Sequence, residues 1–270
     1  MSNEEERRPD NGAAPRTVVV TGAGSGIGRA IAAGFAAAGD HVVIADLSEE
    51  RIHGVGRELG LTDAHVTDVA DDAAVSRLLE RAFESTNRLD VVINSAGIFD
   101  GYAGIRDTTP ELWHRVISVN LHGAYNVART AGILMLDHGV RGSIQCVSSI
   151  GGERASLDGL SYVTSKAAVN HMVRRLAFEL GRDGIRVNAL CPGAVRTGIR
   201  DTSAEILGDL VDMDRGMGVS LTSDVVGFML PEGRYGEPEE VAAVSLFLAG
   251  PGAAYINGQC INVDGGWTSG

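Results

Sequence analysis

The chain of 270 residues is 44% hydrophobic and carries a formal net charge of −12, with a sequence pI of about 5.0. This length allows one large α/β domain or two small ones, with a sizeable core. The acidic balance argues against binding to nucleic acid or to an anionic membrane surface, and no run approaches the about 18 apolar residues that a membrane-spanning helix requires.

The first 16 residues, MSNEEERRPDNGAAPR, are polar and charged. No long apolar segment follows the pair Arg7-Arg8, so the stretch is not typical of an export signal. We expect a disordered tail over 1–16. Residues 17–270 show no break in composition that would mark a second domain, and we expect one catalytic domain there.

Short β-branched runs alternate with amphipathic segments from residue 17 onward. In one such segment Val169, Val173, Leu176 and Leu180 follow helical spacing. Strands that alternate with helices indicate βαβ units, and so predict an α/β fold with one Rossmann-type doubly wound parallel sheet of about seven strands and helices on both faces. The predicted strands are 17–21, 41–45, 64–66, 91–94, 143–147, 186–190 and 259–263.

A glycine-rich turn, TGAGSGIG at 21–28, follows the first predicted strand and opens a predicted helix. The literal pattern G-x-G-x-x-G does not occur. Glycine nevertheless lets the backbone turn tightly and approach a pyrophosphate, and a helix N-terminus offers free N–H groups and the positive end of a dipole. A plain strand-to-helix turn is the alternative, but the density of glycines favours a dinucleotide site.

Asp46 stands at the end of the second predicted strand, where a carboxylate can accept hydrogen bonds from an adenosine ribose. The same carboxylate would repel a 2′-phosphate, and no Arg or Lys falls within 23–25 to compensate. We therefore expect NAD as the cofactor rather than NADP. The alternative role for Asp46 is a helix cap before Ser48.

Tyr162 and Lys166 are four residues apart in the stretch SYVTSK at 161–166, and would share one face of a helix. A free phenol has a pKa of about 10, and a nearby ammonium charge lowers it. The pair can therefore act as a proton-transfer device. Most pairs at this spacing are exposed helix residues, so the stretch alone leaves both interpretations open.

The three cysteines, Cys146, Cys191 and Cys260, lie in or beside apolar runs, and no CxxC pair occurs. This pattern is typical of buried, reduced thiols, so we expect a cytoplasmic protein. The seven histidines show no ligand spacing, and no structural or catalytic metal is expected.

Taken together, these segments resemble the short-chain dehydrogenase/reductase family over nearly the whole chain after residue 16. No single segment is decisive, but their order and spacing are specific. One departure is NSAG in place of the commoner NNAG, from which we expect altered local hydrogen bonding and no loss of activity. The matching segments are TGAGSGIG at 21–28, Asp68-Val69, NSAG at 94–97, Asn120, Ser148-Ser149, Tyr162 with Lys166, RVNA at 186–189, Pro192-Gly193, GRYGEPEEV at 233–241 and NVDGG at 262–266.

The resemblance implies roles for individual residues. Tyr162 would be the catalytic acid/base, and Lys166 would bind the nicotinamide ribose and lower the pKa of the tyrosine. Ser149, which stands thirteen residues before Tyr162, would hold the substrate oxygen, and Asn120 would keep a water molecule in the proton path. The residues implied to contact NAD are Gly22, Ser25, Gly26, Ile27, Gly28, Asp46, Leu47, Asp68, Val69, Asn94, Ala96, Gly97, Tyr162, Lys166, Pro192, Gly193, Val195 and Thr197.

The expected function is therefore an NAD-dependent alcohol dehydrogenase or carbonyl reductase that acts on a small-molecule substrate. One alternative is a non-catalytic dinucleotide-binding regulator, which typically lacks the tyrosine or the lysine. Another is an epimerase or dehydratase of the related longer family, for which this chain is too short.

The stretch 198–234 is too long for an ordinary loop, and the resemblance places a substrate lid there. Ile206, Leu207, Leu210 and Val211 have helical spacing, which predicts a short amphipathic helix with its acidic residues in solvent. Carboxylates outnumber arginines in this stretch, so we expect a mainly apolar, cyclic or bulky secondary alcohol or ketone. A sugar or a 3-oxoacyl thioester is the alternative substrate. The apolar residues can also serve only to pack the lid onto the sheet.

Two helical segments, 112–136 and 167–180, carry more apolar surface than one sheet face covers. The resemblance implies that these helices pair across two-fold axes in a homotetramer, or in a dimer. Burial within one subunit is the alternative.

Overall fold

The computed structural model describes residues 15–215 and 233–269. The tail predicted over 1–16 and the part of the predicted lid between 216 and 232 therefore lie outside the described residues, apart from the last two residues of that tail. One of these, Arg16, forms an ion pair with Asp40 at 2.6 Å. This contact fixes the chain immediately before the first strand.

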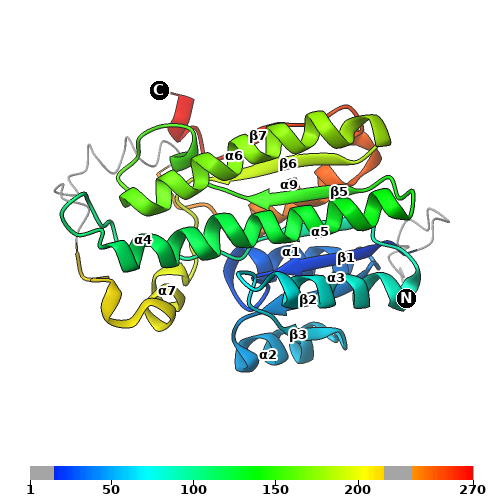
Figure 1. Cartoon of the computed structure of the whole chain (residues 1–270), viewed down its shortest axis with the longest axis horizontal. Coiled ribbons are helices and arrows are strands. Elements are labelled where there is room, and N and C mark those ends of the chain that lie inside the picture. Colours follow the sequence, from blue (N-terminus) through cyan, green and yellow to red (C-terminus); the bar gives the residue numbers. More distant parts are fainter. Residues whose placement is uncertain (1–14, 216–232, 270) are drawn as a thin grey trace, which may run out of the picture.

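Seven parallel strands form one sheet in the order β3-β2-β1-β4-β5-β6-β7 (Figure 1). Val19 at the centre of β1 pairs with Val43 of β2 on one side and with Val92 of β4 on the other. The predicted fold class is confirmed, with β2 and β6 one and two residues longer than predicted and β7 one residue shorter. The strands are Thr17–Thr21 (β1), His41–Asp46 (β2), Ala64–Val66 (β3), Val91–Asn94 (β4), Ser143–Val147 (β5), Arg186–Pro192 (β6) and Cys260–Val263 (β7).

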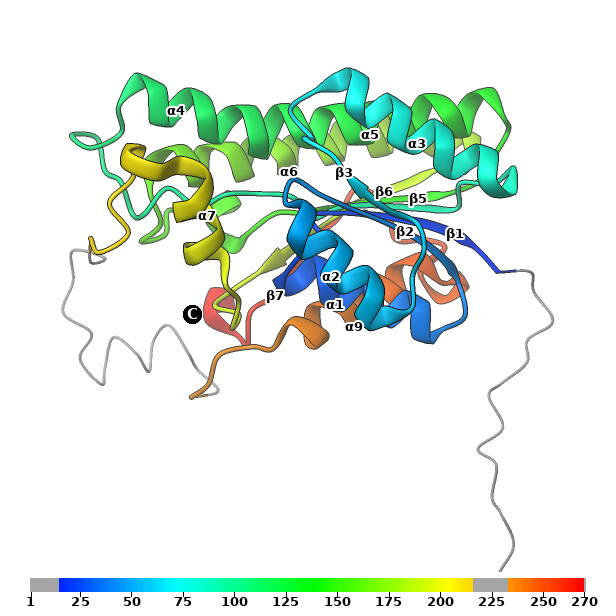
Figure 2. The same ribbon diagram turned by 90° about the horizontal axis from the view of Figure 1, so that it is seen from below.

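Helices cover both faces of the sheet (Figure 2). One face packs under α3, α4, α5 and α6, and the other under α1, α2 and α9. Two apolar cores result, because successive residues of each strand point to opposite faces. The helices are Gly26–Ala37 (α1), Glu49–Leu59 (α2), Asp72–Thr86 (α3), Pro110–Ile117 (α4), Gly123–Asp137 (α5), Leu160–Leu180 (α6), Ile199–Leu207 (α7) and Pro238–Ala249 (α9).

The strand order reverses between β1 and β4, and in such sheets ligands bind beyond the carboxyl ends of the strands at this point. Helix α7 lies beyond those ends in both views. It contains only Ile206 and Leu207 of the four residues predicted to form a lid helix, and Leu207 is buried against the core. Leu210 ends a 3-10 turn that follows α7, and Val211 is extended. The acidic side of α7 and the residues that follow it are exposed, as predicted, at Asp201, Glu205, Asp209, Asp212 and Asp214.

None of the helices within 15–215 and 233–269 is both long and apolar enough to cross a lipid bilayer.

Candidate active site

The turn between β1 and α1 brings backbone against backbone. Gly22 has a φ of +66°, and a Cβ on it would lie 2.5 Å from the amide nitrogen of Ala96. A Cβ on Gly28 would lie 2.1 Å from the carbonyl oxygen of Gly22, so neither position tolerates a side chain. Ser25, which precedes α1, makes no side-chain capping hydrogen bond. The first N–H groups of α1 are therefore available to an anionic group.

A cavity of about 520 Å³ extends from this turn to Tyr162, a size typical of cofactor and small-molecule sites. All the residues predicted to bind cofactor or to act in catalysis line it, apart from two asparagines. Asn94 and Asn120 are buried behind its wall. The side chain of Asn94 accepts a hydrogen bond from the Thr21 hydroxyl at 2.7 Å, so it ties β4 to β1.

Asp46 lies in the cavity at the end of β2. Its carboxylate accepts hydrogen bonds from the N–H groups of Gly24 at 3.1 Å and Ser48 at 3.0 Å. The residue that caps α2 is Ser48, not Asp46, because the Ser48 hydroxyl accepts from the N–H of Arg51. The capping alternative for Asp46 is therefore wrong, and the residue lines the cavity.

The structure also brings a cation to Asp46 that the sequence analysis missed. Arg51, in the first turn of α2, lines the cavity, and its guanidinium is 3.8 Å from the Asp46 carboxylate. It also pairs with Glu205 of α7. The sequence does carry a signal for this contact. Arg51 lies only five residues after Asp46, in the first turn of the helix that follows it, whereas the expectation of no compensating cation considered residues 23–25 alone.

Tyr162 and Lys166 lie on one face of α6, as their spacing predicts. The ammonium of Lys166 is 5.6 Å from the centre of the Tyr162 ring and donates a hydrogen bond to the carbonyl of Val147 at 2.9 Å. Ser149, in the loop after β5, lines the same end of the cavity as Tyr162, and its hydroxyl accepts a hydrogen bond from the N–H of Gly151 at 3.1 Å. A base, an ammonium and a hydroxyl donor thus meet at one end of the cavity.

Burial sets the protonation of this group. Burial raises the pKa of Tyr162 above its usual value, the Asp158 carboxylate raises it further, and the Ser149 side chain opposes both. Burial lowers the pKa of Lys166 to about 8. Burial thus opposes the lowering of the tyrosine pKa that the resemblance implies, because desolvation disfavours the charged phenolate.

Asn120 sits in a π-helical turn, Ser118–His122, between α4 and α5. Its amide donates to the Ile98 carbonyl at 2.9 Å and to the Ser165 hydroxyl at 3.1 Å, and its oxygen accepts from the Ile98 N–H at 2.8 Å. A Cβ on Gly97 would lie 3.3 Å from the Lys166 Nζ and 3.5 Å from the Asn120 oxygen. Such turns often occur at functional sites, and here the amide oxygen and the Lys166 ammonium both lie beside Gly97.

Asp158 is a cavity residue that no motif revealed. It lines the cavity four residues before Tyr162, and the Ser156 hydroxyl donates to its carboxylate at 2.8 Å. Burial raises its pKa. Arg200 of α7 also lines the cavity, 5.3 Å from the centre of the Tyr102 ring. Loop and lid residues of this kind carry no periodic signal, so only the folded chain places them.

Comparison with known proteins identifies the family. A sequence model described as enoyl-(acyl carrier protein) reductase matches residues 22–268. The chain belongs to the short-chain dehydrogenase/reductase family. Enzymes of this family are oxidoreductases that bind a nicotinamide dinucleotide, and the close backbone approach at Gly22 and Gly28 fits such a cofactor.

The chain is similar to members that act on different molecules. It is 34% identical over 260 residues to 3beta-hydroxysteroid dehydrogenase 2 of Eggerthella lenta, covering 95% of this chain and 96% of that protein. It is 35% identical to the L-tagatose-forming galactitol 2-dehydrogenase of Cereibacter sphaeroides, covering 92% of this chain and 93% of that one. A structure of actinorhodin polyketide ketoreductase with NADPH matches with a TM-score of 0.82 and 32% identity, over 94% of this chain and 97% of that chain.

Proposed function

We propose that this protein is an NAD-dependent oxidoreductase that transfers a hydride between the nicotinamide and a secondary alcohol or ketone, with Tyr162 as the acid/base. The observation that carries the proposal is the grouping of Tyr162, Ser149 and Lys166 at one end of a cavity that begins at the glycine turn. The glycine turn would hold the phosphates, and Lys166 together with the segment 192–197 would hold the nicotinamide end.

The bound nicotinamide supplies the acceptor or donor of the hydride, and its oxidised ring carries a positive charge. In the oxidative direction the Tyr162 phenolate accepts the hydroxyl proton of the alcohol, and in the reductive direction the phenol returns that proton to the carbonyl oxygen. Ser149 donates a hydrogen bond to the substrate oxygen while charge develops on it. A positive charge on Lys166 would favour the phenolate, whereas burial of Tyr162 disfavours it.

Asp46 supports NAD over NADP. Its carboxylate is fixed by two backbone N–H groups on the cofactor side of the cavity, where it can accept hydrogen bonds from a ribose and repel a phosphate. Arg51 weakens this repulsion but is itself shared with Glu205, so the preference for NAD holds.

The substrate side of the cavity supports a mainly apolar, cyclic or bulky secondary alcohol or ketone. Its wall includes several apolar and aromatic side chains, and one similar protein is named for a hydroxysteroid, a bulky cyclic alcohol. The apolar members of this wall are Ile98, Phe99, Ile150, Leu157, Ile199 and Ile206.

A polyol is a second candidate substrate, favoured by Asp158 and Arg200. A carboxylate and a guanidinium in the wall can hydrogen-bond further hydroxyl groups of a substrate, and another similar protein is named for galactitol. The two candidate substrates differ in their dependence on Asp158, which would contribute to the binding affinity of a polyol but not to that of an apolar substrate.

Exposed apolar side chains support assembly into a homotetramer or a dimer. Tyr125, Ile133 and Leu136 share a face of α5 and are 50%, 41% and 42% exposed, and Phe178 on α6 is 80% exposed. The free buried thiols of Cys146 and Cys191 support a reducing, cytoplasmic environment.

The proposed function is tested by turnover. The purified protein is supplied with NAD or NADH and with cyclic alcohols and ketones, polyols and an acetoacetyl thioester, and the nicotinamide absorbance is followed. The highest kcat/KM is expected for cyclic or bulky apolar substrates. Binding of the dinucleotide without turnover of any compound in the panel would favour a regulator instead.

A further inference from the structure

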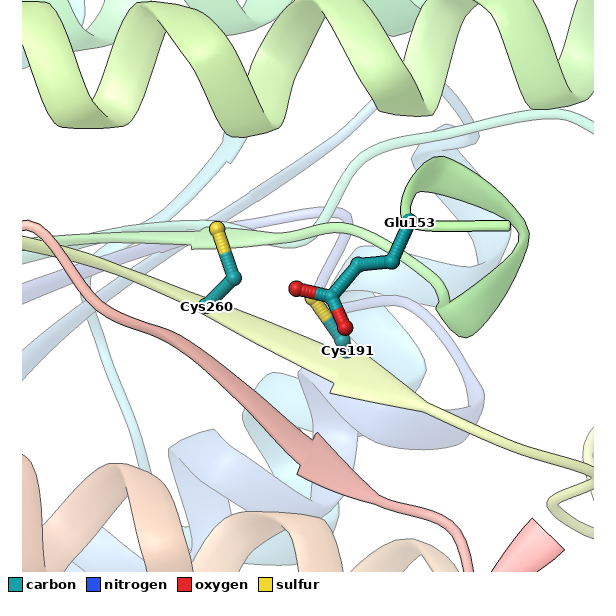
Figure 3. A group of neighbouring side chains, drawn as sticks. All are labelled: Glu153, Cys191 and Cys260. Atoms are coloured by element: carbon teal, nitrogen blue, oxygen red, sulfur yellow. The ribbon is translucent and has the colours of Figure 1, made fainter. Parts of the chain in front are cut away.

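Two cysteines and a glutamate converge beside the active site (Figure 3). Cys191 is near the end of β6, Cys260 opens β7, and Glu153 follows the turn that begins after Ser149. The two sulfur atoms and a carboxylate oxygen of Glu153 all lie within 4.8 Å of one another. Cys191 is buried, Cys260 is half-buried, and the Glu153 side chain is 26% exposed. The group is thus fixed from inside and open to solvent from the side of the carboxylate.

The strand register excludes the simplest use of two neighbouring thiols, a disulfide. Cys191 pairs with Asn262, and Cys260 pairs with Ala189, so the cysteines are diagonal neighbours, two residues out of step. Parallel strands lie about 4.8 Å apart and rise about 3.3 Å per residue, so residues two out of step have Cα atoms roughly 8 Å apart, whereas a disulfide needs about 4.4–6.8 Å. A metal ion removes this constraint, since with metal–sulfur bonds of about 2.3 Å it holds two sulfur atoms roughly 4 Å apart.

Asn170 of α6 supplies an independent observation. This residue is 1% exposed, and its amide oxygen accepts a weak hydrogen bond from the Cys191 thiol at 3.7 Å. Its amide nitrogen has no hydrogen-bond partner within the described ranges of the chain. Rotation of the amide would present that N–H to the sulfur, which is the contact that a metal-bound thiolate requires from its surroundings.

The charge of the group is also compatible with a cation. Two thiolates and a carboxylate carry three negative charges, of which a divalent cation neutralises two. The guanidinium of Arg174, 3.7 Å from the Glu153 carboxylate, balances the third. Sulfur ligands select thiophilic ions, and three protein ligands with one free position are typical of zinc.

We propose that Cys191, Cys260 and Glu153 form a binding site for a thiophilic divalent cation, with Zn²⁺ as the ion that fits best. On binding, the two S–H bonds break, two metal–sulfur bonds form and two protons pass to solvent, without any change of oxidation state. Water fills the fourth position. The site does not depend on the proposed oxidoreductase reaction.

A metal ion bound at this site would connect chain segments that contribute residues to the candidate active site. Cys191 directly precedes the Pro192-Gly193 turn, and Glu153 closes the turn that starts at Ser149. A metal ion would therefore hold β6, β7 and the Ser149 turn together. The sequence prediction of no metal rested on spacing along the chain, and these ligands come from three distant segments.

Co²⁺ is the probe for the test, because thiolate ligands give it charge-transfer bands in the near ultraviolet and tetrahedral geometry gives it intense bands in the visible. The whole reduced chain is titrated with Co²⁺ in a non-chelating reductant, and Zn²⁺ is then added. We expect one Co²⁺ per chain with both sets of bands, displacement by Zn²⁺, and a higher unfolding temperature with Zn²⁺ than with a chelator.

Cys260→Ser should lower the affinity for Co²⁺ at least about a hundredfold, more than the loss of an outer-shell contact usually causes, and Glu153→Gln should lower it about tenfold. Cys146→Ala is the matched control, because it removes a buried thiol from β5, outside the cluster, and should leave the bands unchanged. Cys260 is half-buried, so its replacement is not expected to prevent folding, and retained cofactor binding checks this. Absent charge-transfer bands, or equal affinity in Cys260→Ser, would overturn the proposal, as would a Cys191–Cys260 disulfide formed with diamide.

Discussion

Arg51 on α2 and Glu205 on α7 form an ion pair that joins the cofactor side of the cavity to the lid helix. The same guanidinium is 3.8 Å from the Asp46 carboxylate, so one side chain links Asp46 to α7. Movement of α7 away from α2 would break this pair. A partly exposed ion pair of this kind contributes about 0.2–1 kcal/mol.

Loss of the pair should therefore speed release of the cofactor. We expect Glu205→Gln to raise the dissociation rate of NADH about two- to fivefold, as measured by stopped-flow fluorescence. The control is Glu58→Gln, which removes the exposed pair between Arg29 and Glu58, away from the cavity. Equal rates in the two variants would show that the pair does not restrain the lid.

We expect Asp46 and Arg51 together to set the cofactor preference. The unmodified protein should favour NAD over NADP by at least about a hundredfold in kcat/KM, which corresponds to about 2.7 kcal/mol. Asp46→Ala should narrow this ratio, because it removes the repulsion and frees Arg51 to pair with the 2′-phosphate. The double variant Asp46→Ala/Arg51→Ala should lose most of the gain in NADP use. Equal use of both cofactors by the unmodified protein would refute the preference.

Asp158 should control the pH at which the enzyme works. Its carboxylate raises the pKa of Tyr162, so Asp158→Asn should lower that pKa. Alcohol oxidation needs the phenolate, and its rate rises as pH passes through the tyrosine pKa. The rise in kcat/KM should therefore move to lower pH in Asp158→Asn and stay in place in Asp201→Asn, which changes an exposed carboxylate of α7. A shift to higher pH would contradict this assignment.

The same variant also separates the two candidate substrates. A large fall in the affinity of Asp158→Asn for polyols alone would favour a polyol as the substrate.

Two glycines in neighbouring elements should respond in opposite ways to alanine. Gly28→Ala places a Cβ 2.1 Å from a backbone oxygen, so dinucleotide binding should be lost and stability should fall. At Gly54 of α2, a Cβ would meet nothing within 4 Å, and Gly54→Ala should raise the free energy of unfolding by about 0.5–1 kcal/mol. Denaturant titration and cofactor fluorescence measure both effects. Similar results for the two variants would exclude close backbone approach as the role of Gly28.

The sheet was predictable because buried parallel strands are short β-branched runs between turn signals, as with Val18, Val19 and Val20. The positions of the glycine turn and of the Tyr162–Lys166 pair were predictable because each feature is formed by residues that are close together in the sequence. The pKa of Tyr162 was not, since it depends on desolvation and on Asp158, which only folding brings beside the phenol. The diagonal placement of Cys191 and Cys260 depends on strand register, which the sequence does not display.

The assignment of Tyr162 as the acid/base is the central claim, and Tyr162→Phe tests it most directly. This variant keeps the ring and removes only the transferable proton. We expect unchanged NADH affinity in a fluorescence titration and a fall in kcat of at least about a thousandfold, or about 4 kcal/mol in the barrier. A kcat within about tenfold of the unmodified protein, a barrier change of about 1.4 kcal/mol or less, would contradict the account.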